Sequence, residues 1–251
     1  MEIEQLTINF FSGVFLAVFA IGLSSNFRIV KFLNLAYGSF FTLGAYVAYH
    51  FFTKFGVLSL VILLLVSSLS GASLYILMRL IGKGILEATI VSLGFGILLE
   101  ELLRLCHTTG YFLILDTPIK TYTILGVEIS QWEVMQLGVL MIVLLTLTLV
   151  FKSRYGIKIK FIEEDVELAS MYGVNHNFYE ALCICNTSIL ATLLGFLSSP
   201  HQAIFPSMGW SILVAGIIVF AITSQFKLVG LKHYLVLAAV SIAYAEVVGW
   251  F

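Results

Sequence analysis

Long apolar stretches follow one another along almost the whole chain, separated by short polar interruptions. About eight of them have the length that a helix needs to cross the hydrocarbon core of a bilayer. Because a segment in lipid must satisfy its own backbone hydrogen bonds, each stretch is predicted to be a helix. The ranges are about 7–25, 32–52, 57–79, 85–106, 132–151, 179–199, 210–226 and 229–250. The pattern therefore predicts an all-α fold, a polytopic transmembrane helical bundle of about eight spans.

The longest polar interruption runs from Lys152 to Asn177. It opens with basic residues and continues with acidic ones: Lys152, Arg154, Lys158 and Lys160, then Glu163, Glu164, Asp165 and Glu167. Its apolar residues recur at roughly helical spacing, which predicts a short amphipathic helix outside the membrane. They are Ile162, Val166, Ala169 and Val174. Both a solvated connector and an element that docks onto a partner fit this pattern.

The composition excludes a soluble fold. Hydrophobic residues make up 60% of the chain and charged residues 11%, with a mean hydropathy of +1.06. Soluble domains are about half apolar and about a quarter charged. No tandem repeat and no low-complexity linker divides the 251 residues, so we predict a single transmembrane domain over 1–251.

The basic residues are divided unevenly between the two sides of the predicted bundle. The first, third, fifth and seventh interruptions carry ten Lys and Arg residues, and the other side carries three. Since Lys and Arg accumulate in cytoplasmic loops, the interval 152–177 is predicted to be inside and both termini extracytoplasmic. The chain starts with Glu2 and Glu4 and lacks a basic segment there, so the first stretch is expected to remain as a span in the inner or plasma membrane.

Ionisable residues lie near the outer end of the fourth predicted span, where they are costly unless they are paired or face water. Glu100 and Arg104 are four positions apart, so we expect a local ion pair, with contact to a delivery protein as the alternative. The interval 107–131 follows and carries Asp116 and Pro118. It is expected to form a folded external loop.

Small and polar residues recur on one face of three predicted spans, at separations of three and four positions. In lipid such faces favour close helix packing, and they also suit the lining of a path for a polar solute. The sequence leaves both interpretations open. The candidate path residues are Asn34, Gly38 and Thr42 in the second span, Thr89, Ser92 and Gly96 in the fourth, and Ser188 and Thr192 in the sixth.

No set of residues points to catalysis or to a bound cofactor. The five histidines lack metal-ligand spacing, and Cys183 and Cys185 face different sides of one helix, so no metal site is expected. The chain has no G-x-x-x-x-G-K-[ST] phosphate loop and no nucleophile signature. We therefore expect neither an enzyme nor a cofactor, and no nucleic-acid partner.

Three segments, at consistent distances along the chain, resemble one known family. Asn34–Tyr46 reads NLAYGSFFTLGAY, Phe205–Trp210 reads FPSMGW, and the interval 152–177 carries a basic start, an acidic pair and a closing glycine. They are similar to the Asn-Phe-Ala-His-Gly segment, the Pro-Ser-Met-Gly turn and the cytoplasmic coupling loop of the branched-chain amino acid type of ABC-transporter permease. The resemblance covers most of the chain.

The resemblance implies one permease half of an ATP-driven importer that forms the path for a small polar solute, branched-chain or related amino acids first. It implies a second permease subunit, a copy or a similar chain, with two cytoplasmic ATPase subunits and an extracytoplasmic substrate-binding protein. ATP hydrolysis would then take place on a partner. A coupling helix is expected over Lys160–Gly173, with Ala169 closest to the ATPase. The coupling residues would be Gly156, Lys160, Glu164, Asp165, Ala169 and Gly173.

Three features depart from the family pattern. Lys160-Phe161 stands where the family has Arg-Ala, and Thr223-Ser224-Gln225 where it has Gly-Gly. Arg and Lys are not interchangeable in bidentate contacts. The chain also ends before the family's usual cytoplasmic end, which suggests a divergent or reduced member. The alternative from another class is a secondary carrier or channel for a solute such as urea or an amide, working without ATPases. Such a protein is expected to carry ionisable residues near the bilayer midplane, whereas the charges of this chain lie near the ends of the predicted spans, which argues against it.

Overall fold

The computed structural model describes residues 2–82, 84–107, 112–115, 120–124 and 127–249. Helices take up 82% of the chain, which confirms the prediction of an essentially all-α protein. Among the described residues, five helical segments are long and apolar enough to cross a membrane, as in a multi-pass membrane protein. They are Gln5–Val30, Ala36–Ile81, Gln131–Lys152, His176–Ser198 and Leu231–Val248. The count of eight spans stays a prediction.

Local features account for the difference between five segments and eight predicted ranges. The segment Ala36–Ile81 holds two long helices, α2 (Ala36–Val47) and α4 (Ser59–Ile81). A π-helical stretch, the short α3 (Thr53–Phe55) and a 3-10 turn join them. Helix α5 (Ile85–Cys106) is long enough but carries four ionisable residues: Glu87, Glu100, Glu101 and Arg104. Helix α10 (Gly209–Ser224) has only 16 residues.

The predicted outer loop contains a small antiparallel sheet. Strands β1 (Thr121–Ile124) and β2 (Val127–Ser130) pair with Thr121 opposite Ser130. Ser130 then starts α6 (Gln131–Lys152), because its hydroxyl accepts from the Glu133 N–H while the Glu133 carboxylate accepts from the Ser130 N–H. Asp116 and Pro118, named above for this loop, lie outside the described residues.

The chain falls into two compact units, and the first holds α6, α11 (Leu231–Val248) and most of α1 (Glu2–Val30) and α10. It comprises Met1–Ser24, Pro118–His176 and Ala215–Phe251. Small residues allow its helices to approach closely: Gly13 of α1 faces Ile242 of α11, and Gly216 of α10 faces Phe19. The single domain over 1–251 stays a prediction.

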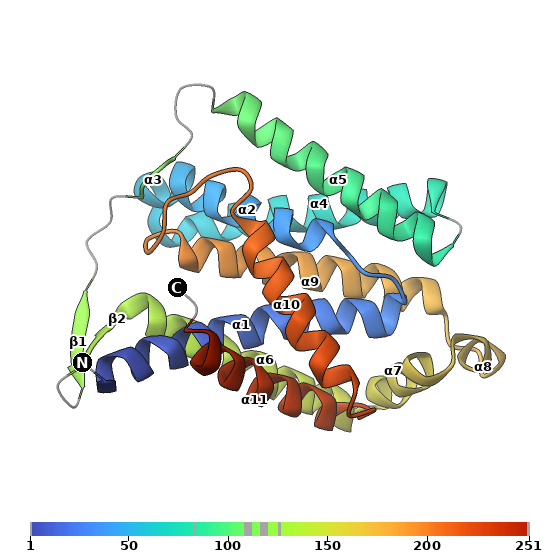
Figure 1. The fold of residues 1–251 in the computed structure, drawn as a ribbon. Helices are drawn as coiled ribbons and strands as arrows, with labels where there is room; N and C mark the ends of the chain where they lie inside the picture. Colours follow the sequence, from blue (N-terminus) through green and yellow to red (C-terminus); the bar gives the residue numbers. More distant parts are fainter. Residues whose placement is uncertain (1, 83, 108–111, 116–119, 125–126, 250–251) are drawn as a thin grey trace. The chain divides into compact units, whose positions relative to one another are not determined.

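The second unit comprises Ser25–Thr117 and Asn177–Val214. In it α2, α4, α5 and α9 (His176–Ser198) lie side by side (Figure 1). Helix α2 is its most enclosed element, since eleven of its twelve residues are buried. Its neighbours α4 and α5 pack against it, and α9 meets it where Gly44 contacts the Thr192 carbonyl.

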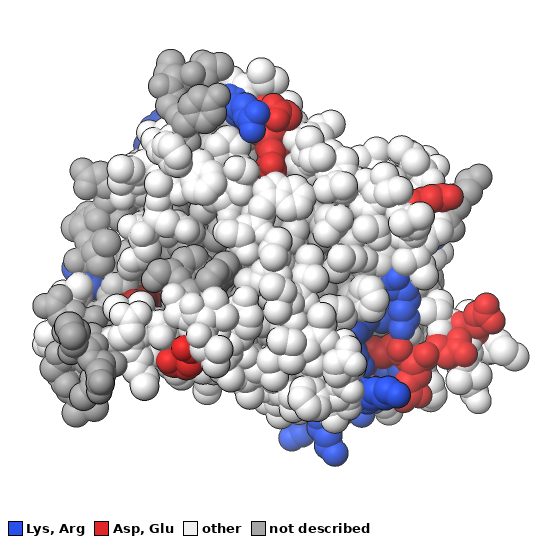
Figure 2. Space-filling view, viewed as in Figure 1, with Lys and Arg blue, Asp and Glu red and all other residues white. Residues whose placement is uncertain are grey.

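The polar interval forms two helices, α7 (Arg154–Glu164) and α8 (Val166–Met171), so the single helix expected over 160–173 is wrong in its bounds. Asp165 separates them with extended backbone, and its Oδ1 accepts from the N–H groups of Glu167 (2.8 Å) and Leu168 (3.2 Å). This side-chain cap starts a new helix and ends the old one. In Figure 2, charged side chains gather at and beside α7 and α8.

Candidate functional site

The chain between α1 and α2 is not helical, although it is largely enclosed by protein. Helix α1 ends at Val30, Lys31 has a left-handed φ of 66°, and α2 begins only at Ala36. Phe32 and Asn34 are each only 1% exposed. Buried irregular backbone must find hydrogen-bond partners outside its own segment, on side chains, neighbouring helices or bound molecules. The break between α1 and α2 is therefore a place where a polar site can exist.

Ser92 of α5 supports this break. The Leu35 N–H donates to the Ser92 hydroxyl at 3.0 Å, and the same oxygen lies 3.4 Å from the Leu33 carbonyl oxygen. A buried N–H that helix geometry leaves without a partner thus finds one on a neighbouring helix. Thr89, one turn earlier, donates to its own helix at Ile85 and is more exposed. The structure brings Ser92, and not Thr89, to the break.

Asn34 is the polar residue of the break that has nothing to bind among the described residues. Its side chain is buried, and neither its amide nitrogen nor its amide oxygen has a hydrogen-bond partner. Leaving one buried polar group without a partner costs about 1–3 kcal/mol. Helix α2 follows at once, and no side chain caps its N-terminus. An open amide next to a buried helix N-terminus is suited to a polar or anionic solute group.

Gly38 and Thr42 lie at a contact between two helices. A Cβ built at Gly38 would stand 2.7 Å from the carbonyl oxygen of Gly209, the first residue of α10. The Gly209 N–H donates to the Thr42 hydroxyl at 3.1 Å. For these two residues the structure supports the packing interpretation, because both are occupied by α10.

Gly96 and Glu100 of α5 face α2 through Ser39. A Cβ at Gly96 would stand 2.9 Å from the Ser39 hydroxyl, which donates to Glu100 at 3.0 Å. Glu100 is only 7% exposed, whereas Arg104 pairs with Glu101 at 3.2 Å. The expected Glu100–Arg104 pair is therefore wrong. The Ser39 hydroxyl of α2 donates to Glu100, and Arg104 pairs instead with Glu101, which is more exposed.

The two predicted residues of α9 join it to its neighbours. Ser188 donates to the Ser67 carbonyl of α4 at 3.0 Å, and Thr192 contacts Gly44 of α2 through its backbone. The Thr192 hydroxyl itself donates to Ser188 O, within α9. The α9 residues thus serve close helix contacts, as small residues do in lipid.

The predicted coupling residues form a folded segment of their own. Helix α7 is attached to α11, because Glu163 accepts from the Gly230 N–H (3.2 Å) and the Tyr234 hydroxyl (3.3 Å). Lys160 lies beside Gly230 as well. Gly156 is buried against the end of α6, and Gly173 (φ 72°) turns the chain after α8. Glu164 and Asp165 are exposed.

Ala169 lies on the buried, apolar side of its segment, and its contact with an ATPase stays a prediction. It is 0% exposed and packs inside this segment, as Ile162 does. Ile162, Ala169 and Val174 of the predicted apolar set are all buried, so the apolar side of the segment faces inward. The exposed large apolar residues of α8 and the turn after it are Leu168 (41%), Met171 (84%) and Tyr172 (70%), and α7 exposes Tyr155 and Ile157. In α8 and the turn after it, the large apolar side chains open to the surroundings are these three, whereas Ala169 is enclosed.

The family of branched-chain amino acid transport system permease components matches residues 7–251. The chain belongs to this family. The match confirms the resemblance drawn from the three segments, and it identifies the chain as a transport permease rather than an enzyme. No curated protein and no solved structure matches the chain in the corresponding comparisons.

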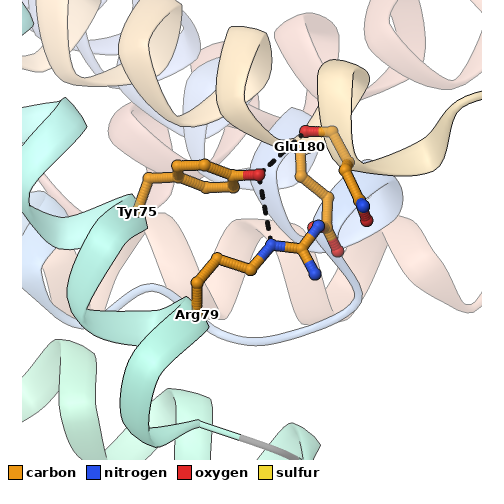
Figure 3. Close-up of polar contacts among 4 residues, drawn as sticks. Tyr75, Arg79 and Glu180 are labelled. Atoms are coloured by element: carbon orange, nitrogen blue, oxygen red, sulfur yellow. Dashed lines mark hydrogen bonds and ion pairs between the residues drawn. The ribbon is translucent and has the colours of Figure 1, made fainter.

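One polar cluster of the permease escaped the sequence reasoning. Arg79 at the end of α4 pairs with Glu180 at the start of α9, with Nη2 and Oε2 at 2.9 Å (Figure 3). Tyr75 accepts from the Arg79 Nε–H at 3.1 Å and donates to the Asn177 carbonyl at 3.3 Å. From the sequence, Arg79 is one of the ten basic residues assigned to the predicted cytoplasmic interruptions, and nothing marks it further. Arg79 and Glu180 are separated by 101 positions in the sequence, so no local spacing pattern could have predicted their ion pair.

Proposed function

We propose that the permease is one half of the membrane domain of an ATP-driven importer for a branched-chain or related amino acid. The family match supports this class of solute. The observation that supports the importer role is a group of exposed apolar residues: Leu168 and Met171 of α8, and Tyr172 directly after it. Helix α8 is short, is flanked by polar residues and is separate from the long apolar helices. An apolar patch rimmed by charges is typical of a protein contact.

The partners follow from this role. A second permease, a copy or a similar chain, would complete the membrane domain, two ATPase subunits would dock at α8 inside, and a binding protein would deliver the solute outside. ATP would act by favouring one conformation of the assembly through differential contacts. The bonds from Glu163 to Gly230 and Tyr234 link α7 to the start of α11. A displacement of α8 would reach a membrane helix by this route.

The solute path is proposed at the break between α1 and α2. Asn34 supports it, because its buried amide has both polar atoms open. In transporters with discontinuous helices, half-helix N-termini bind anionic groups of the solute. The start of α2 would serve in this way, and Gly38, Thr42 and Gly96 would hold its walls through close contacts.

The coupling proposal is tested by Met171→Asp. The charge should prevent docking on an apolar surface, so ATPase association and amino-acid uptake should fall together by at least about tenfold, while membrane insertion is unchanged. Glu164→Ala, an exposed position beside the Asp165 cap, is the control and should have little effect. Full ATPase association by the Met171 variant would refute α8 as the docking element. Ala169→Arg is not a clean test, because Ala169 is buried in the segment itself.

The orientation has its own test. Tyr122 of β1 and Glu167 of α8 are both exposed, so each can be replaced by cysteine in a chain whose native cysteines are serine. In intact cells a membrane-impermeant maleimide should label Tyr122→Cys and leave Glu167→Cys unlabelled until the cells are opened. The reverse labelling would show that both termini lie inside.

Glu100 favours a second candidate, a secondary carrier driven by protons. It is a buried carboxyl group on an apolar helix, and buried ionisable residues in membrane helices commonly serve proton relays. Uptake by permease-only proteoliposomes that a protonophore abolishes and Glu100→Gln eliminates would establish this candidate. Uptake that needs ATP and the ATPases, and survives Glu100→Gln, would exclude it.

A further inference from the structure

Helix ends of the second unit surround a cavity of about 280 Å³. The end of α1 at Val30, the end of α4 at Arg79, the start of α5 at Gly84 and the start of α9 at Glu180 all line it. The distribution of Lys and Arg predicts that these ends are cytoplasmic. The volume is at the small end of the range for ligand pockets, so the cavity suits a small molecule.

Arg79 is held in place before any ligand arrives. Its Nε–H donates to Tyr75, its Nη2–H donates to Glu180, and its guanidinium lies 5.4 Å from the centre of the Tyr75 ring (Figure 3). Nη1 makes no hydrogen bond to a described residue. A guanidinium fixed on two sides loses little further freedom when it binds a carboxylate. The start of α5, which no side chain caps at Gly84, adds positive potential to the same wall.

Glu180 and an apolar wall complete the lining. The Glu180 side chain is 16% exposed, and a carboxylate has enough acceptor sites to bind an ammonium group as well as Arg79. Val30, Phe32 and Met78, none more than 8% exposed, provide the apolar part. The cavity therefore offers a cation, an anion and an apolar surface at close range.

We propose that this cavity binds the transported amino acid itself, as an exit-side site. The α-carboxylate would bind Arg79, the α-ammonium would bind Glu180, and an apolar side chain would lie against Phe32 and Met78. The inference rests on the proposed function, since it assigns a second station to the same solute. The same pairing of an anionic group with a primary ammonium occurs in the headgroup of phosphatidylethanolamine, so the test separates the two sources.

The first experiment needs no variant. The assembled transporter, in nanodiscs of phosphatidylcholine alone, is titrated with leucine, with isocaproate, which lacks the ammonium, and with isoamylamine, which lacks the carboxylate. Leucine should bind, and loss of either charged group should raise Kd by at least about tenfold. Equal binding of leucine and both analogues would overturn the proposal.

Two variants locate the binding. Arg79→Gln should weaken leucine and isocaproate alike by about tenfold and leave isoamylamine unchanged. Ala88→Phe places a ring in the cavity lining, leaves Arg79 and Glu180 unaltered in sequence, and should abolish the leucine binding that depends on Arg79. Arg104→Gln is the matched control. Like Arg79, Arg104 pairs with a glutamate near a helix end, but it lies on α5 and outside the cavity lining. Unchanged leucine binding in Ala88→Phe would overturn the site.

The remaining outcomes are also decisive. If phosphatidylethanolamine copurifies with the unaltered chain but not with Ala88→Phe, and leucine does not bind, the cavity is a lipid site and the proposal is wrong. ATP-dependent leucine uptake is measured in the same preparation. Uptake without binding at the cavity would refute this inference alone, whereas absence of uptake of any amino acid would refute the proposed function.

Discussion

Helices α2 and α6 are both rich in apolar residues, yet protein surrounds only one of them. Helix α2 buries eleven of twelve residues, whereas the buried residues of α6 are only Trp132, Gln136 and Leu140 out of 22. The buried helix holds the small and polar residues, and the exposed one holds Met141, Ile142 and Leu145. Helix α2 thus buries large side chains such as Phe40 and Phe41 together with its small ones, whereas α6 leaves most of its large apolar side chains at least partly exposed.

The difference follows from the solvent. Lipid tails are as apolar as leucine, so burying a large apolar side chain gains little when helices associate. Close backbone approach does gain dispersion and hydrogen-bond energy, and only small residues permit it. In α2, Gly38 and Gly44 permit this close approach, because a Cβ at either position would meet the backbone of another helix. A Cβ added at Gly138 of α6 would meet nothing within 4 Å. Glycines in the two helices therefore have different consequences.

The largest effect is expected at these glycines. Gly38→Ala would drive a methyl group into the Gly209 carbonyl, and backbone on both sides leaves little room to yield. We expect a loss of about 3 kcal/mol in the free energy of unfolding, or no folded protein, measured by denaturation in mixed micelles. Gly138→Ala should leave stability unchanged or raise it by up to about 1 kcal/mol. Equal effects would show that α2 is not held by backbone contact.

An intermediate effect is expected at Asn34, a buried residue just before α2 whose side-chain amide has no hydrogen-bond partner among the described residues. Asn34→Leu removes an unpaired amide, so stability should stay level or rise by about 1 kcal/mol, while amino-acid uptake falls at least about tenfold. The control is Asn26→Leu, which removes a buried amide that donates to Thr187 at 3.0 Å and should destabilise by about 1 kcal/mol. Full uptake by the Asn34 variant would remove this residue from the path.

The smallest effect is expected on α6. Ile142 is 61% exposed, so Ile142→Ala should change the free energy of unfolding by less than about 0.5 kcal/mol. Leu140 is 6% exposed, and Leu140→Ala should cost roughly 2 kcal/mol. The measurement also sharpens the comparison: loss of the permease pair in Ile142→Ala, with a stable single subunit, would show that α6 faces a second permease and not lipid.

The apolar runs predict the long helices well, because each helix in lipid must satisfy its own backbone. The range 85–106 agrees with α5 at both ends. The ranges 7–25 and 32–52 predict an interruption before residue 32, but not the non-helical backbone at 31–35. This stretch has neither proline nor glycine, and the Leu35 N–H finds its partner in Ser92, 57 positions away. The pattern of apolar and polar residues along the chain cannot show a hydrogen bond between residues that are distant in sequence.

The coupling segment shows a different limit. The signal for its division was present, since an Asp followed by helix-forming residues is a common N-cap. The apolar spacing placed Ala169 on the apolar side of the segment, where it is buried, but it did not show that Asp165 divides the segment into two helices. Among the candidate path residues, type and spacing identified those at close helix contacts. They did not distinguish Asn34, whose open amide emerges only from the full set of neighbours.

The contact between α10 and Thr42 also sets an order of events during synthesis. Helix α10 is only about 24 Å long, which is shorter than the hydrocarbon core, and its first N–H binds a hydroxyl made 167 residues earlier. At roughly 5–20 residues per second, the ribosome reaches Gly209 on the order of 10–30 s after Thr42. During that interval the Gly38 face of α2 lacks its neighbour α10, so the close packing of α2 can be completed only late in synthesis.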